Sequence, residues 1–169
     1  AQKIDGIAGV IHADHLCYQH GLAEPVSALM FELITKMSMT YVMAPSTSRG
    51  KNILPRVAAL KGVGMLSDVI EIVSPDTFKR PIYAGNAIAT VQSLDAFKVL
   101  TVRASAFSLA PQASALAPLQ VCDYLSEGHT SQFISEALAS TDRPDLASAE
   151  RVVSGGRGLK APENFSLVE

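Results

Sequence analysis

The sequence predicts an α/β fold of three layers, in which a mostly parallel sheet is flanked by helices and carries an added antiparallel meander. Strand-like runs at residues 7–13 and 40–44 alternate with helical patterns, as in domains built on a parallel sheet. Between residues 68 and 103, β-rich runs follow one another across spacers that are too short to hold crossover helices. We expect this fold to be incomplete at both ends of the chain.

The first strand is predicted at residues 7–13 (IAGVIHA), a short apolar run with β-branched side chains. The first helix is predicted to begin at Glu24 and Pro25, because proline fits the first turn of a helix without losing a hydrogen bond. Its apolar residues recur at helical spacing and should face the core as one stripe: Val26, Leu29, Met30, Leu33 and Met37.

A second strand is predicted at residues 40–44 (TYVMA), and the polar loop PSTSRGK follows it. The next helix carries Ile53, Val57 and Leu60 on one side. Gly62 is expected to end this helix, because glycine readily adopts the left-handed conformation of a helix terminus.

Turn-forming sequences (SPDT, AGN and SLDA) separate the β-rich runs of the meander. The runs are residues 68–73, 78–83, 87–92 and 97–103. Pro81 has no amide N–H, so its run is expected at a sheet edge or a bulge. The turn at residues 83–86 should place Gly85 or Asn86 at a positive φ. Residues 104–122 carry no charge and contain two prolines, which predicts an irregular surface connection.

A polar, proline-containing stretch at residues 140–148 is the best candidate for a linker between domains. We therefore assign residues 1–147 to an N-terminal α/β domain that lacks its first βαβ portion. Residues 148–169 are assigned to the end of the linker and the truncated start of a second domain. That start is predicted as a strand at residues 151–153, a glycine-rich turn, and a helix around residues 162–168.

The composition excludes several classes of protein. With 48% hydrophobic residues and a formal net charge of −2, the 169-residue chain is not intrinsically disordered. Its 14 Lys and Arg face 16 Asp and Glu, so no nucleic-acid partner is expected. No apolar run approaches the roughly 18 residues of a membrane helix, so no direct membrane insertion is expected. Cys17 and Cys122 do not suit a disulfide scaffold and fit a reducing compartment.

The clearest candidate binding site is the turn Ser154-Gly155-Gly156-Arg157-Gly158. Its glycines allow positive φ and let a ligand approach the backbone closely, and a helix N-terminus beyond them would offer free N–H groups to an anion. Arg157 adds a permanent cation that can form paired hydrogen bonds or stack on an aromatic ring. From the pattern alone, a tight strand-to-helix turn with a solvated arginine is an equally good interpretation.

Other clusters are less specific. His12, Asp14, His15 and His20 lack a recognised metal-ligand spacing, so loop and strand-end histidines are favoured and no metal site is predicted. Residues 46–51 follow a strand, where phosphates often bind, but they lack the glycine pattern of a phosphate cradle, and a plain helix-entry loop is favoured. An adenine-nucleotide-binding α/β signalling module that uses this loop is the alternative function.

Four segments, taken in order, resemble the α subunits of electron transfer flavoproteins. They are KNILPRVAAL (residues 51–60), SPDTFKRPIYAGNA (residues 74–87), TDRPDL (residues 141–146) and RVVSGGRGLK (residues 151–160). The similarity extends over nearly the whole chain, so the chain is identified as a member of this family. The resemblance implies a heterodimer of α and β subunits that carries one FAD. Such a protein passes single electrons from acyl-CoA and related dehydrogenases, in fatty acid β-oxidation, to a membrane quinone oxidoreductase.

The resemblance also implies an electron carrier rather than an enzyme with its own substrate turnover, in the mitochondrial matrix or, alternatively, the bacterial cytoplasm. In this family an N-terminal domain without cofactor precedes a domain that holds FAD. Ser154, Gly156, Arg157 and Gly158 match the family's first flavin-contacting turn, and Arg157 would stabilise negative charge on the reduced flavin. Because one turn cannot bury a flavin, we expect this chain alone to bind no FAD and to act as a subunit-docking domain.

Overall fold

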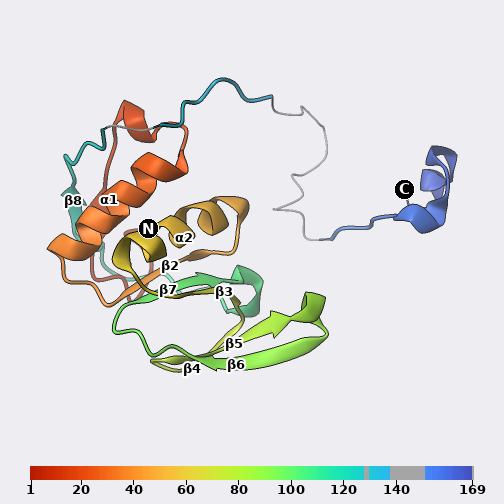
Figure 1. The fold of residues 1–169 in the computed structure, drawn as a ribbon, viewed down its shortest axis with the longest axis horizontal. Helices are drawn as coiled ribbons and strands as arrows, with labels where there is room; N and C mark the ends of the chain where they lie inside the picture. Colours follow the sequence, from red (N-terminus) through yellow and green to blue (C-terminus); the bar gives the residue numbers. More distant parts are fainter. Residues whose placement is uncertain (128–129, 138–150, 169) are drawn as a thin grey trace. The chain divides into compact units, whose positions relative to one another are not determined.

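The structure, a computed structural model, describes residues 1–127, 130–137 and 151–168. The chain forms two compact units, Ala1–Phe133 and Ile134–Glu169 (Figure 1). The predicted linker at residues 140–148 lies outside the described residues.

The centre of the first unit is a parallel sheet of three strands in the order β2-β7-β3. Its strands are Tyr41–Pro45, Lys98–Val102 and Met65–Val69, respectively. The middle strand, β7, pairs Val99 with Val42 of β2 and Leu100 with Leu66 of β3. Val99, Leu100 and Thr101 are buried, as expected for a parallel strand that is covered on both faces.

Two helices lie on one face of this sheet (Figure 1). α2 (Ser48–Lys61) contacts the three strands, and α1 (Ala23–Lys36) packs on α2. Thr47 caps α2 by accepting a hydrogen bond from the amide of Gly50, and Gly62 ends the helix at φ 67°, as predicted. Pro25 lies in the first turn of α1, also as predicted.

The larger core lies between the helices and the sheet. It contains Ile34 of α1, Val99 of β7, and four residues of α2: Ile53, Leu54, Val57 and Ala58. The predicted stripes differ in detail, because Leu60 is 55% exposed and Met37 is 49% exposed. In α2 the buried residues occur as two adjacent pairs four residues apart, so Leu60 projects to the side of the buried face.

A second, antiparallel sheet in the order β4-β5-β6 lies between β3 and β7 along the chain. Its strands are Glu71–Ser74, Thr77–Ile82 and Ala87–Gln92. Phe78 of β5 is 1% exposed and forms a smaller core with Val69 and Leu100 of the parallel sheet. Leu100 follows Val99 on β7, so this core lies on the face opposite the helices. The predicted α/β class, with a parallel sheet and an antiparallel meander, is confirmed.

Two predictions about the meander are wrong. Residues 97–103 do not form its last strand but contain β7, the middle strand of the parallel sheet. The meander connects β3 to β7 and takes the place of a crossover helix, which the length of single spacers cannot reveal. The run at residues 68–73 is also divided, because β3 ends at Val69 and β4 begins at Glu71 in the other sheet.

Pro81 lies in β5, the middle strand of its sheet, and not in an edge strand. Its missing N–H is tolerated because the pairing with β4 ends at Lys79, so that Pro81 faces only Ile88 of β6. The turn at residues 83–86 is confirmed. Gly85 has φ 92° as predicted, Tyr83 and Ala84 also have positive φ, and Asn86 does not.

A short parallel pair joins β1 (Val10–His12) to β8 (Leu119–Val121). β1 is shorter than the predicted run at residues 7–13, and β8 lies within the stretch predicted to be irregular. The rest of that stretch contains a 3-10 turn at Ala104–Ala106 and an isolated antiparallel bridge between Gln112 and Ile4. Within the described part of the chain, no helix is both long and apolar enough to cross a bilayer.

Candidate functional site

The glycine-rich turn lies in the second unit and leads into two short 3-10 helices, Arg157–Leu159 and Pro162–Leu167. The second of these occupies the place of the predicted helix, with Pro162 in its first turn. The predicted strand at residues 151–153 is not formed. A strand needs a neighbour for its backbone hydrogen bonds, and no described strand pairs with these residues.

The glycines of the turn do not use the positive φ that the sequence suggested. Positive φ occurs instead at Lys160, which ends the first 3-10 helix at φ 66°. At Gly155, a Cβ would lie 2.0 Å from Cδ1 of Leu159, so alanine there would require the leucine side chain to change rotamer. Beside Gly156 and Gly158, by contrast, a Cβ would meet no atom within 4 Å. Both positions therefore leave the backbone open to a ligand.

Hydrogen bonds hold the two 3-10 helices together. The amide of Leu159 donates to the carbonyl oxygen of Gly156 at 3.0 Å, which closes the turn around Arg157. The side-chain amide of Asn164 donates to the carbonyl oxygen of Leu159 at 2.6 Å. The arginine thus lies on a turn that is fixed by its own backbone and by one side chain.

The predicted contact residues Ser154, Gly156, Arg157 and Gly158 are all exposed and adjacent along this turn. Arg157 forms no ion pair with another residue of the described ranges. Its guanidinium is therefore free to donate paired hydrogen bonds or to stack on a flat ring.

A second candidate lies in the first unit, at the carboxyl ends of β2, β3 and β7, where ligands often bind in α/β folds. A cavity of about 400 Å³ there is lined by Ser46, Thr47 and Lys51, from the loop that the sequence indicated, and by Asp68 and Arg103. The sheet edge therefore brings the alternative nucleotide loop next to a pair of opposite charges.

Asp68 and Arg103 form an ion pair at this edge. Hydrogen bonding from Arg103 holds the pKa of Asp68 below its usual range. The backbone of Asp68 is left-handed, with φ 61°, and its amide donates to Oγ1 of the buried Thr101 at 2.9 Å. Lys51, the other cation of the lining, also acts on the Asp68 carboxylate, and a negative charge at this edge does not favour a nucleotide's phosphates.

Sequence reasoning missed this pair. Asp68 is the first residue of one β-rich run that the sequence did place, and Arg103 is the last residue of another, but both runs were assigned to a meander. Parallel strands end at the same edge of a sheet, so the correct topology for residues 97–103 would have brought the two side chains together.

The histidines have local roles. Nδ1 of His15 accepts a hydrogen bond from the amide of Cys17 at 3.3 Å. The ring of His20 stacks on Phe133, with centroids 3.7 Å apart. His12 lies at the end of β1. Among the residues that the structure describes, no three His, Cys, Asp or Glu side chains are grouped so as to hold a metal ion.

Comparison with known proteins decides the family. Residues 1–127 match a family model described as the electron transfer flavoprotein domain. The chain belongs to the electron transfer flavoprotein family. The resemblance that the sequence motifs indicated is thereby confirmed.

Individual relatives extend the match across both units. A Pseudomonas aeruginosa protein named electron transfer flavoprotein subunit alpha is 48% identical over 99% of this chain. Its namesake in Paracoccus denitrificans is 46% identical over 100% of the chain. A Cryptococcus neoformans protein named as the probable mitochondrial subunit alpha is 41% identical over 99%. The chain spans about half the length of these relatives, covering 54%, 54% and 49% of them.

Proposed function

We propose that this chain is part of the α subunit of an electron transfer flavoprotein, a heterodimer that carries single electrons. The observation that supports this most directly is 46% to 48% identity, over essentially the whole chain, to bacterial proteins of that name. Since the chain spans about half of their length, the electron transfer itself is proposed for a complete α subunit that carries this sequence.

The glycine-rich turn fits one side of a flavin site. Gly156 and Gly158 leave the space beside their backbones open, and the exposed Arg157 lies between them. A planar ring could approach this backbone closely, with the guanidinium against it. We therefore assign Ser154, Gly156, Arg157 and Gly158 as FAD contacts. FAD, when bound, supplies the capacity to accept and release electrons one at a time.

Arg157 is proposed to tune the flavin electrostatically. Its guanidinium stays protonated at physiological pH. A fixed cation beside the flavin lowers the free energy of the negative charge that reduction adds, and so raises the reduction potential. The turn is too exposed to exclude water by itself, so the remaining walls of the site must come from other parts of the complete protein.

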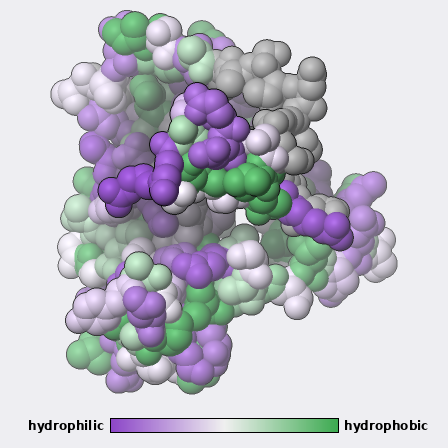
Figure 2. Space-filling view, turned by 90° about the vertical axis from the view of Figure 1, so that its right-hand side faces the viewer, coloured by the Kyte–Doolittle hydropathy of each residue, from purple (hydrophilic) through white to green (hydrophobic). Residues whose placement is uncertain are grey.

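The first unit is proposed to dock a β subunit. It exposes large apolar side chains, among them Ile72, Ile88 and Leu94, and Figure 2 shows apolar residues interspersed with polar ones on one face of the molecule. Mixed surfaces of this kind are ordinary in interfaces between proteins. The proposed donors are acyl-CoA dehydrogenases and the proposed acceptor is a membrane quinone oxidoreductase. Mitochondrial and bacterial relatives support the mitochondrial matrix, or the cytoplasm in a bacterium, as the compartment.

The test is the potential of the flavin in a complete αβ protein with Arg157→Ala. We expect the first-electron potential to fall, by about 60 mV for each tenfold loss of preference for the reduced flavin. Arg157→Lys should restore most of the potential, because lysine keeps the charge. Arg151→Ala is the matched control, since Arg151 is an exposed arginine of the same unit. Equal potentials in the Arg157→Ala and Arg151→Ala proteins would overturn the assignment of Arg157.

A further inference from the structure

Residues 124–127 and 130–133, here called the exit segment, are the last part of the first unit before the chain continues to the second. They lie against residues 18–24, which run from the end of the 3-10 turn Leu16–Tyr18 into the first turn of α1. The hydrogen bonds of Tyr18 and Glu24 join residues that are 106 or 107 positions apart in the sequence. Three side chains of residues 18–24 make the contacts: Tyr18, His20 and Glu24.

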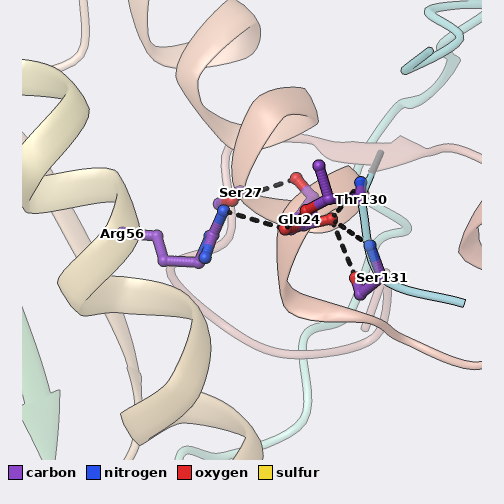
Figure 3. A network of polar contacts seen from close by, with 5 residues as sticks. All are labelled: Glu24, Ser27, Arg56, Thr130 and Ser131. Carbon is purple, nitrogen blue, oxygen red and sulfur yellow. Dashed lines mark hydrogen bonds and ion pairs between the residues drawn. The ribbon is translucent and has the colours of Figure 1, made fainter. Parts of the chain in front are cut away.

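Glu24 uses both carboxylate oxygens to hold the exit segment (Figure 3). Oε2 accepts the backbone amides of Thr130 and Ser131, each at 2.9 Å, and the Ser131 hydroxyl at 2.8 Å. Oε1 accepts the Thr130 hydroxyl at 2.7 Å and faces Arg56 of α2 at 3.5 Å. The Glu24 side chain is only 19% exposed in consequence. These bonds, the Ser131 amide first, lower the pKa of Glu24 to about 2.

Two further contacts, each made by a ring-bearing side chain, hold the exit segment before and after the residues that Glu24 binds. The Tyr18 hydroxyl donates to the carbonyl oxygen of Tyr124 at 2.7 Å. The rings of His20 and Phe133 stack with an interplanar angle of 4°. Burial is the first cause that raises the pKa of Tyr18, to about 12, so its hydroxyl keeps the proton that it donates.

These contacts lie at the end of the first unit. The boundary between the two units falls between Phe133 and Ile134, directly after the last contact. Glu24 is itself fixed to the core, because it lies in the first turn of α1 and α1 packs on α2. The ten residues from 124 to 133 would add roughly 35 Å of reach if they were released and fully extended.

We propose that Tyr18, His20 and Glu24 form an anchor that fixes the point at which the chain leaves the first unit toward the glycine-rich turn. Glu24 is the main positioning residue of this anchor. By shortening the free tether, the anchor raises the effective concentration of the second unit near the first. The consequence for electron transfer rests on the proposed function, whereas the anchor is a property of the fold and is tested without reference to flavin.

The test is hydrogen exchange, read by mass spectrometry in peptides that cover residues 124–133 of the complete protein. In Glu24→Ala, the amides of Thr130 and Ser131 lose a charged acceptor, and their exchange should accelerate about 10- to 100-fold. Peptides from β7 should keep their protection, which shows that the core is intact. Glu32→Ala is the matched control, because Glu32 is an exposed glutamate of the same helix.

A second variant tests the anchor without any change in α1. Thr130→Val with Ser131→Ala removes the two hydroxyl donors and leaves the helix unchanged. We expect a smaller acceleration in the same peptides and faster cleavage by chymotrypsin after Phe133. Exchange in Glu24→Ala that equals the exchange in Glu32→Ala, or no effect of the double variant, would overturn the anchor. If the complete wild-type protein protected residues 124–133 from exchange but bound no flavin, only the proposed function would be contradicted.

Discussion

Gly50 is a residue whose identity is dictated by a close approach of two backbones. A Cβ at this position would lie 2.1 Å from the carbonyl oxygen of Pro45, where the start of α2 meets the end of β2. Backbone atoms cannot move aside as a flexible side chain can. The fold therefore requires glycine here for space and not for a positive φ.

Gly50→Ala should destabilise the first unit by about 2–3 kcal/mol, because the extra carbon forces α2 away from the sheet. Gly62→Ala is the matched control. Gly62 has φ 67° with no atom near its virtual Cβ, so alanine there costs only about 1 kcal/mol of backbone strain. Urea unfolding of both variants measures the difference. An equal or smaller loss in Gly50→Ala would show that the junction of β2 and α2 is loose.

Sequence reasoning handles these two glycines unequally. Gly62 was predictable, because a glycine after a helical stripe is a local signal for the helix end. Gly50 was not, since its crowding depends on how α2 docks against β2. The positive φ of Asp68, Tyr83 and Ala84 was also missed, because no local sequence signal indicates a positive φ at these residues.

At the scale of elements, the sequence located the helices well and correctly placed Ile53 and Val57 on the buried face of α2, but it misjudged how far that face extends. The residues of α2 that are fully buried include Leu54 and Val57, and the predicted core residue Leu60 is 55% exposed. A stripe of apolar residues predicts that a segment is helical. Which residues of the stripe are most deeply buried depends on the surface that the helix packs against. Met37, the last residue of the stripe predicted for the first helix, lies just beyond the end of α1 and is 49% exposed.

This difference predicts opposite behaviour for two leucines of one helix. Leu54→Ala removes a side chain with 0% exposure and should destabilise the protein by about 2–5 kcal/mol. Leu60→Ala should change the stability by less than about 0.5 kcal/mol, because Leu60 is more than half exposed. Thermal and urea unfolding of the two variants provide the comparison. A large loss from Leu60→Ala would mean that this face of α2 is covered.

Strand order was the harder problem at this scale. The positions of β2, β5, β6 and β7 were close to the predicted runs, but β7 was assigned to the wrong sheet. The spacer before β7 is short, and short spacers usually join antiparallel neighbours. What decides its place is Leu100, which packs against Phe78 and Val69 across two sheets, a contact between residues far apart in the sequence.

At the scale of the whole molecule, the candidate site shows the same limit. The sequence located the turn and the 3-10 helix at Pro162–Leu167, both of which follow from local glycine and proline signals. It also predicted a strand at residues 151–153, which is not formed. Glycine turns are specified locally, whereas a strand exists only in a sheet, and the described residues of the second unit supply no other strand.

The exposure of the second unit leads to a prediction about the isolated chain. Ser154, Gly156, Arg157 and Gly158 are all exposed, and a flavin needs a pocket that covers most of its surface. We therefore expect the 169-residue chain, purified and passed through gel filtration with added FAD, to retain no stoichiometric flavin absorption. A complete αβ protein treated in the same way should retain one flavin per heterodimer. Stoichiometric flavin on the isolated chain would mean that its exposed turn closes around the ligand. It would contradict the proposal that other parts of the complete protein supply the rest of the flavin site.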